Sequence, residues 1–230
     1  MDNIVPHLSK MAKYPVLKYP NSDFHSLKEL YPKDKILIFG YGSLINSQSA
    51  SRSVSAEALE SMRPVVTFGM KRIFNYKARQ TAHWGADQNE KEKAMLNITP
   101  TPTINSMING VVMEVTAEDL AKLVDREKGY DLVPLIVISW EDFVSGNPEP
   151  KTEIAYSFIA PTELRQNILY TSTSFYPVRG YLHAVREGAQ TLSDEFLDFL
   201  NETTYMADGT TLVKDWDEET FTDLLCDKKY

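Results

Sequence analysis

The sequence contains very little cysteine and no long apolar segment. Cys226 is the only cysteine among 230 residues, so no intrachain disulfide can form, and the chain suits a reducing compartment. The N-terminal segment lacks the continuous apolar core of a secretory signal peptide, and no apolar run approaches the roughly eighteen residues that a membrane helix needs. We therefore expect a cytoplasmic protein that is not bound to a membrane.

Positive charge and histidine are also scarce. The chain has 24 Lys and Arg against 32 Asp and Glu, a net charge of −8 at pH 7, so its charge does not favour binding to a phosphate backbone. We expect no nucleic acid partner. The four histidines lie far apart in the sequence, at His7, His25, His83 and His183. Without a spaced set of ligands, the sequence predicts neither a metal site nor a cofactor.

What the sequence does contain is the composition and patterning of a globular domain. Hydrophobic residues make up 43% of the chain and charged residues 24%. Short apolar runs predict strands over 36–39, 65–68, 73–76, 94–98, 108–115, 130–140 and 153–160. Thr116, with Asp119 three residues later, predicts a capped helix that ends near Gly129. Further helices are expected over 179–190 and 193–201.

Strands around one central helix, with helices gathered at the end, predict an α+β domain built on a small mixed, mainly antiparallel β-barrel with packed helices. Residues 1–35 are rich in proline and have no helical or strand period, which predicts an extended N-terminal arm. The domain is expected over 36–202. Residues 203–230 are expected to form an acidic C-terminal tail, with a short helix over 217–225.

The first strand ends in a glycine-rich turn, Gly40-Tyr41-Gly42-Ser43-Leu44. The turn is not a dinucleotide fingerprint, because Ile45 stands where the third glycine would be, and it is not a nucleophile elbow, because Ser43 is not followed by X-Gly. Two glycines one residue apart allow the backbone amides of Gly42, Ser43 and Leu44 to approach and bind an anion. An ordinary turn after a strand is the alternative.

Several segments together resemble the γ-glutamylcyclotransferase superfamily, in order and in spacing. The resemblance rests on IFGYGSL (38–44), NGVV (109–112), VDREKGY (124–130), YL (181–182) and EGA (187–189). It covers residues 36–200. Two segments within this range, 81–93 and 162–177, have no counterpart in it, so the resemblance assigns them no role.

The resemblance implies a small barrel fold and an enzyme that releases 5-oxoproline from a small γ-glutamyl amine, amino acid or peptide, such as glutathione, without a cofactor. It implies that Glu127 is the acid and base of the reaction. The substrate would be held by the turn and by a tyrosine of the later helix, at Tyr41, Gly42, Ser43, Leu44 and Tyr181.

The implied reaction has modest chemical requirements. The α-amine of the substrate attacks its own γ-carbonyl, so holding a near-attack conformer supplies much of the rate, and one carboxylate can carry the proton from the α-amine to the leaving amine. Glu127 suits this task if burial raises its pKa. The adjacent Asp125, Arg126 and Lys128 are expected to be surface charges.

Other interpretations remain open at this point. The same fold could be a non-catalytic module that binds a carboxylate-bearing metabolite or a protein. Ser43 could be the nucleophile of a hydrolase with His83 or His183 as its base. Glu127 could be a solvated residue at a helix end, and Tyr181 could belong to a core stripe with Val185.

Overall fold

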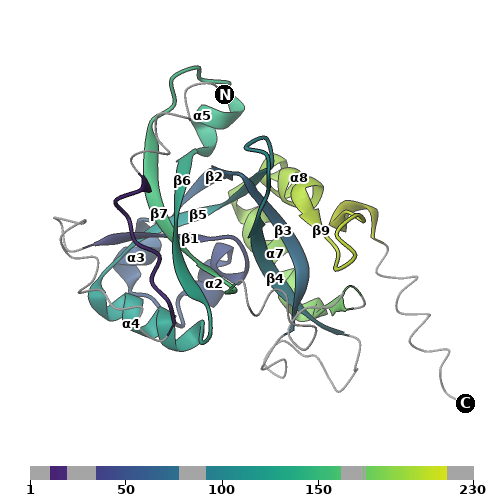
Figure 1. Cartoon of the computed structure of the whole chain (residues 1–230), viewed down its shortest axis with the longest axis horizontal. Coiled ribbons are helices and arrows are strands. Elements are labelled where there is room, and N and C mark those ends of the chain that lie inside the picture. Colours follow the sequence, from purple (N-terminus) through teal and green to yellow (C-terminus); the bar gives the residue numbers. More distant parts are fainter. Residues whose placement is uncertain (1–10, 20–34, 78–91, 162–172, 174, 217–230) are drawn as a thin grey trace, which may run out of the picture.

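The computed structural model describes residues 11–19, 35–77, 92–161, 173 and 175–216. Figure 1 shows a barrel beside a second sheet, with helices packed around both. The strands are β1 (Ile36–Gly40), β2 (Arg63–Phe68), β3 (Met70–Lys77), β4 (Glu92–Pro100), β5 (Met107–Val115), β6 (Asp131–Ser139), β7 (Thr152–Ile159), β8 (Tyr176–Pro177) and β9 (Thr204–Tyr205). The α-helices are α2 (Ser47–Ala50), α3 (Ala56–Glu60), α4 (Ala117–Arg126), α5 (Trp140–Val144), α7 (Arg179–Leu192) and α8 (Asp194–Thr203), with 3₁₀ turns η2 (Ser43–Ile45) and η4 (Val213–Asp215).

Five strands close the barrel in the order β1-β5-β2-β6-β7. Every neighbouring pair is antiparallel except β1 and β7, which run parallel and meet at Ile38 and Tyr156. The barrel interior is apolar, as the burial of Ile38, Val65 and Val137 shows. The predicted class, an α+β protein on a mixed, mainly antiparallel barrel, is confirmed.

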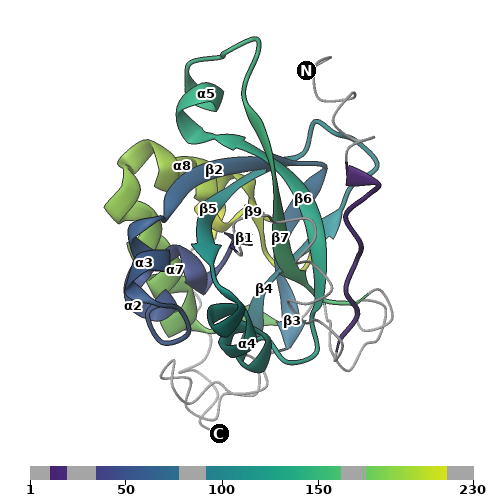
Figure 2. The ribbon, with the colours of Figure 1, turned by 90° about the vertical axis from the view of Figure 1, so that its left-hand side faces the viewer.

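The second sheet has the order β8-β4-β3-β9 and lies against one side of the barrel (Figure 1). Helices α7 and α8 follow one another and pack together beside this sheet, whereas α4 lies at the lower end of the barrel in Figure 2. Tyr181, Leu182 and Val185 of α7 are buried. No helix among the described residues is long and apolar enough to cross a membrane.

Helix α4 begins and ends as the sequence predicts. The Thr116 side chain accepts a hydrogen bond from the Asp119 amide, and the Asp119 carboxylate accepts one from the Thr116 amide, which completes a capping box. The helix ends with Glu127 as its C-cap, followed by Gly129 at a φ of 91°. This sharp ending turns the chain directly into β6 and leaves Glu127 at the junction of helix and strand.

Three segments carry features that the sequence did not predict. The strand predicted over 130–140 ends at Ser139, because Ser139 caps the short helix α5 before β7 begins. Within the predicted arm, Leu17 forms an antiparallel bridge with Leu132 of β6. Within the predicted acidic tail, β9 pairs with β3, so residues 204–205 belong to the second sheet. The helix expected over 217–225 lies outside the described residues.

Arg72 of β3 is a fully buried arginine at the centre of the fold. Its guanidinium donates to Thr204 Oγ1 at 2.7 Å, to the Asn109 carbonyl and side-chain oxygens at 2.8 Å each, and to the Tyr41 carbonyl at 3.3 Å. Thr203 Oγ1 accepts a further bond at 3.1 Å. Burial lowers the pKa of Arg72 to about 9, so the group still carries its charge at neutral pH. Arg72 thereby joins both sheets, α8 and the turn after β1.

We predict that Arg72→Met lowers the free energy of unfolding by roughly 3 kcal/mol or more, because several buried oxygens would lose their donor at once. Urea denaturation measures this change. Arg63→Met is the matched control, since Arg63 forms a partly exposed ion pair with Glu153 at 2.7 Å and should contribute less than about 1 kcal/mol. Equal effects of the two substitutions would contradict the central role of Arg72.

Candidate active site

One cavity of about 470 Å³ opens between the barrel and the second sheet. All six residues that the sequence singles out line it: Tyr41, Gly42, Ser43, Leu44, Glu127 and Tyr181. They come from the turn after β1, the end of α4 and the first turn of α7, so the fold brings together positions that are far apart in the sequence. The remaining lining residues are Phe39, Gly40, Tyr76, Lys77, Met95, Leu96, Asp125, Arg126, Lys128, Tyr130 and Phe158.

The turn after β1, residues 41–44, forms one wall of the cavity, and we call it the cradle. The Gly42 carbonyl accepts from Ile45 N at 2.9 Å and the Ser43 carbonyl from Asn46 N at 3.2 Å, so both carbonyls point along the 3₁₀ turn. The Tyr41 carbonyl points to Arg72. Within the described residues, no partner is found for the amides of Gly42 and Leu44. These amides are the unpaired donors of the wall, as expected at the start of a helical turn.

Helix α7 packs closely against Asn46, which follows the cradle. The Asn46 side chain donates to the Ala184 carbonyl and to the Glu187 carboxylate, each at 3.1 Å. A Cβ at Gly188 would lie 2.6 Å from Asn46 Cα, so only glycine lets α7 approach this closely. The cradle is therefore rigidly held against α7.

Tyr181 of α7 contacts the cradle at Gly42, and both residues line the cavity. Its hydroxyl accepts hydrogen bonds from the amides of Ser43 and Leu96, and a Cβ on Gly42 would overlap the hydroxyl oxygen. Its ring packs edge-on against Phe74 at a centroid distance of 6.2 Å. The hydroxyl lies at the cavity that Tyr181 lines.

Glu127 faces the cradle from the end of α4. Its side chain retains 23% exposure, at the cavity that it lines. Burial raises the pKa of the Glu127 carboxyl, and the neighbouring Arg126 guanidinium, 3.3 Å from Nε to Oε1, partly opposes this effect. A carboxyl whose pKa is raised toward neutrality can accept and return a proton.

Three tyrosine hydroxyls share this environment. Burial raises the pKa values of Tyr41, Tyr130 and Tyr181, and the charge of Glu127 raises each of them further. All three therefore stay protonated at neutral pH and can act as hydrogen-bond donors. Tyr41 uses its hydroxyl to bond the Phe158 carbonyl at 2.9 Å.

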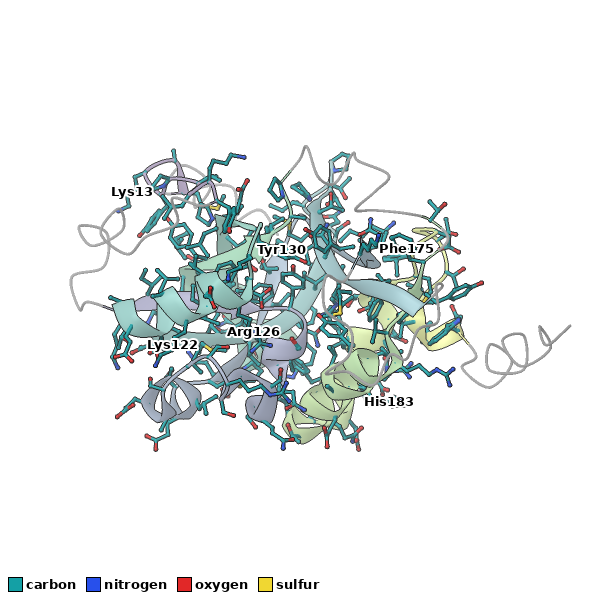
Figure 3. The ribbon with its side chains drawn as sticks, turned by 90° about the horizontal axis from the view of Figure 1, so that it is seen from below. Lys13, Lys122, Arg126, Tyr130, Phe175 and His183 are labelled. Atoms are coloured by element: carbon teal, nitrogen blue, oxygen red, sulfur yellow. The ribbon has the colours of Figure 1, made fainter. Side chains whose placement is uncertain are left out.

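Arg126 is not the surface charge that the sequence suggests. Its guanidinium lies between α4 and the segment after β1, where it donates to Ser43 Oγ at 2.9 Å and to the Ser49 carbonyl at 2.8 Å. Figure 3 shows Arg126 and Tyr130 in the middle of the molecule, whereas Lys122 and His183 lie at its edge. The other two expected surface charges, Asp125 and Lys128, do pair with each other in exposed positions.

The nucleophile interpretation of Ser43 has no support in this geometry. Ser43 Oγ accepts its bond from Arg126, a permanent cation that cannot remove its proton. His183 is exposed on α7 and does not line the cavity, while His83 lies outside the described residues. Among the described residues, no group of three or more His, Cys, Asp or Glu could hold a metal ion.

Sequence reasoning missed Arg126, Tyr76 and Tyr130, which line the cavity, and Arg72, which bonds the Tyr41 carbonyl of the cradle. Arg72 carried one signal, because a charged residue among the buried residues of a strand is unusual. Tyr130 was assigned to a strand, although it precedes β6 and contacts Tyr76 at a ring-centroid distance of 4.9 Å.

We predict that Gly42→Ala destabilises the protein by about 1–3 kcal/mol, because the new methyl group would overlap the Tyr181 hydroxyl. Tyr181→Phe removes that oxygen and leaves its ring carbon Cζ 3.4 Å from the methyl group. Thermal or urea unfolding of both single variants and the double variant measures the coupling. Additive effects would show that the two residues do not meet as described.

The fold resembles solved structures of other proteins. A protein described as gamma-glutamyl cyclotransferase superposes with a TM-score of 0.51 at 17% identity, over 84% of this chain and 99% of its own. YkqA from Bacillus subtilis superposes with a TM-score of 0.54 at 16% identity, over 78% of this chain and 57% of its own. No protein-family model matches the chain, and no curated protein matches it in sequence. Likeness at these identities is a likeness of fold, and the chain has the fold of gamma-glutamyl cyclotransferase.

Proposed function

We propose that the protein cyclises the γ-glutamyl group of a small γ-glutamyl amine, amino acid or peptide, releasing 5-oxoproline and the free amine. The observation that carries the proposal is the position of Glu127, a carboxyl with a raised pKa that faces the free backbone amides of the cradle across one cavity. The shared fold with a protein described as gamma-glutamyl cyclotransferase supports the same reaction class.

In the proposed reaction, Glu127 takes a proton from the α-ammonium group of the substrate. The freed amine attacks the γ-carbonyl carbon, the new carbon–nitrogen bond closes a five-membered ring, and the ring nitrogen releases its surplus proton to solvent. The bond to the leaving amine then breaks as Glu127 returns the proton to that nitrogen. No water or external nucleophile enters, so the protein mainly supplies orientation and proton transfer.

Negative charge develops on the γ-carbonyl oxygen during ring closure. The unpaired amides of Gly42 and Leu44 are suitable donors for this oxygen, because fixed backbone dipoles need no reorganisation as charge develops. The Tyr181 hydroxyl lines the cavity and stays protonated, so it is a suitable donor for the α-carboxylate of the substrate. Phe39, Tyr76, Tyr130 and Phe158 contribute aromatic side chains to the wall of the cavity.

We predict that Glu127→Gln retains the fold and lowers 5-oxoproline release at least a thousandfold, because an amide of the same size cannot accept the proton. Release is measured by chromatography over a panel of γ-glutamyl compounds, and circular dichroism checks the fold. A variant that keeps a tenth of the wild-type rate would remove Glu127 from this role. Absence of release by the wild type across the panel would favour a binding module instead.

The raised pKa of Glu127 also predicts how stability changes with pH. The folded carboxyl holds its proton more tightly than the unfolded one, so its contribution to stability is present below pH 4.5 and is lost as pH rises through the folded pKa. We therefore expect Glu127→Gln to be more stable than wild type at neutral pH, with the difference vanishing below pH 4.5. Urea denaturation at several pH values measures it. A constant difference across pH would contradict the raised pKa.

Cyclisation and hydrolysis differ in the origin of the product oxygen. We predict that turnover in ¹⁸O-labelled water yields unlabelled 5-oxoproline and that Ser43→Ala lowers the rate about tenfold or less, because the backbone amide remains in place. Mass spectrometry of the product and steady-state kinetics provide the two measurements. Labelled free glutamate, with an inactive Ser43→Ala variant, would instead indicate an acyl-enzyme hydrolase.

A further inference from the structure

Arg126 uses all three nitrogens of its guanidinium in the described structure. Nη2 donates to Ser43 Oγ at 2.9 Å and to Ser49 Oγ at 3.0 Å, and Nη1 donates to the Ser49 carbonyl at 2.8 Å and to Ser53 Oγ at 3.4 Å. Nε lies 3.3 Å from Glu127 Oε1. A planar fork with five donors can satisfy this many partners at once, which an ammonium group cannot.

The three serines that accept hydrogen bonds from Arg126 are buried residues: Ser43, Ser49 and Ser53. The Arg126 side chain itself is only 20% exposed. The other charged pair within α4, Lys122 with Glu118, is more than half exposed on both sides. Arg126 therefore differs from an ordinary surface ion pair, whose side chains keep their freedom in water.

These contacts join the two halves of the proposed site. Arg126 is the last residue of α4, and Glu127 follows it as the helix cap, while Ser43 belongs to the cradle. Resting on the proposed function, we propose that Arg126 is a positioning residue that sets the distance between the Glu127 carboxylate and the cradle. The arginine does this by holding Ser43 and Ser49 with one edge and the carboxylate with Nε.

The charges around Glu127 make Arg126 its main electrostatic partner. The other titratable groups that line the cavity with it are the hydroxyls of Tyr41 after β1, Tyr76 of β3, Tyr130 before β6 and Tyr181 on α7, and the exposed ammonium group of Lys77 at the end of β3. Lys128 and Asp125, which also line the cavity, pair with each other at 2.7 Å. Removing the Arg126 charge should therefore change the titration of Glu127, whereas removing a remote charge on α4 should not.

Three variants separate the charge of Arg126 from its geometry. Arg126→Met removes both, and Arg126→Lys keeps the charge but cannot bridge Glu127 and the serines together. Lys122→Met is the matched control, because it removes a cation from the same helix at an exposed position.

Two measurements are made on each folded variant. The first is an NMR titration of Glu127 in protein labelled with ¹³C-glutamate, with its signal assigned by its loss in Glu127→Gln. The second is the pH dependence of kcat and KM for 5-oxoproline release.

We expect Arg126→Met to raise the titration midpoint of Glu127 by about one pH unit and to move the acid limb of kcat/KM with it. Its kcat should fall about 10- to 100-fold with a smaller change in KM, because the groups that touch the substrate remain. Arg126→Lys should restore most of the midpoint but little of kcat. Lys122→Met should resemble wild type in both measurements.

The proposal is overturned if folded Arg126→Met titrates like wild type, or if Arg126→Lys recovers the wild-type kcat. If Arg126 had a purely structural role, Arg126→Met would lower kcat without shifting the acidic side of the pH profile of kcat/KM. If Arg126→Met does not fold, Arg126→Lys decides through its kcat. If the wild type releases no 5-oxoproline, the proposed function fails, and the NMR titration still decides whether Arg126 controls Glu127.

Discussion

The guanidinium of Arg72 lies where the barrel, the second sheet and helix α8 meet, and each of these parts supplies it with oxygen atoms in place of water. Taking an arginine fully out of water is costly unless its donors are all satisfied. The surrounding elements are therefore restricted to positions from which their oxygens reach this one group. One of these oxygens is the Tyr41 carbonyl, and the C=O and the following N–H of a trans peptide point in opposite directions. Fixing that carbonyl consequently fixes where the Gly42 amide points.

Two arginines thus hold the cradle from different sides. Arg72 bonds its backbone from within the fold, and Arg126 bonds the Ser43 side chain from the end of α4. Neither contact satisfies the amides of Gly42 and Leu44, which remain available at the cavity wall of the described structure. The hydrogen bonds of Arg72 and Arg126 hold the cradle in place and leave the Gly42 and Leu44 amides unpaired. A preorganised anion site requires donors that are both held in place and unpaired.

Much of the architecture could be read from the sequence because local signals agreed with the tertiary fold. The strand of residues 108–115 and the capping box of Thr116 and Asp119 are local patterns, and both appear as predicted. The ending of β6 at Ser139 was missed, because the apolar run continues into Trp140 and only the serine cap separates strand from helix. The roles of Arg72 and Arg126 could not be predicted, since their partners lie more than thirty positions away in the sequence and depend on barrel closure.

The barrel closes along the parallel pair of β1 and β7, whose register contains the single match of Ile38 with Tyr156. Side chains reinforce this seam, since Ser157 Oγ donates to the Phe39 carbonyl at 2.9 Å and Tyr41 donates to the Phe158 carbonyl. The seam is also the last part of the barrel that a growing chain can complete, because its two strands are separated by more than a hundred residues. Phe39, Tyr41 and Phe158 line the cavity, so the binding site is complete only when this seam has formed. A ligand bound in the cavity would therefore stabilise the closed seam relative to the open one.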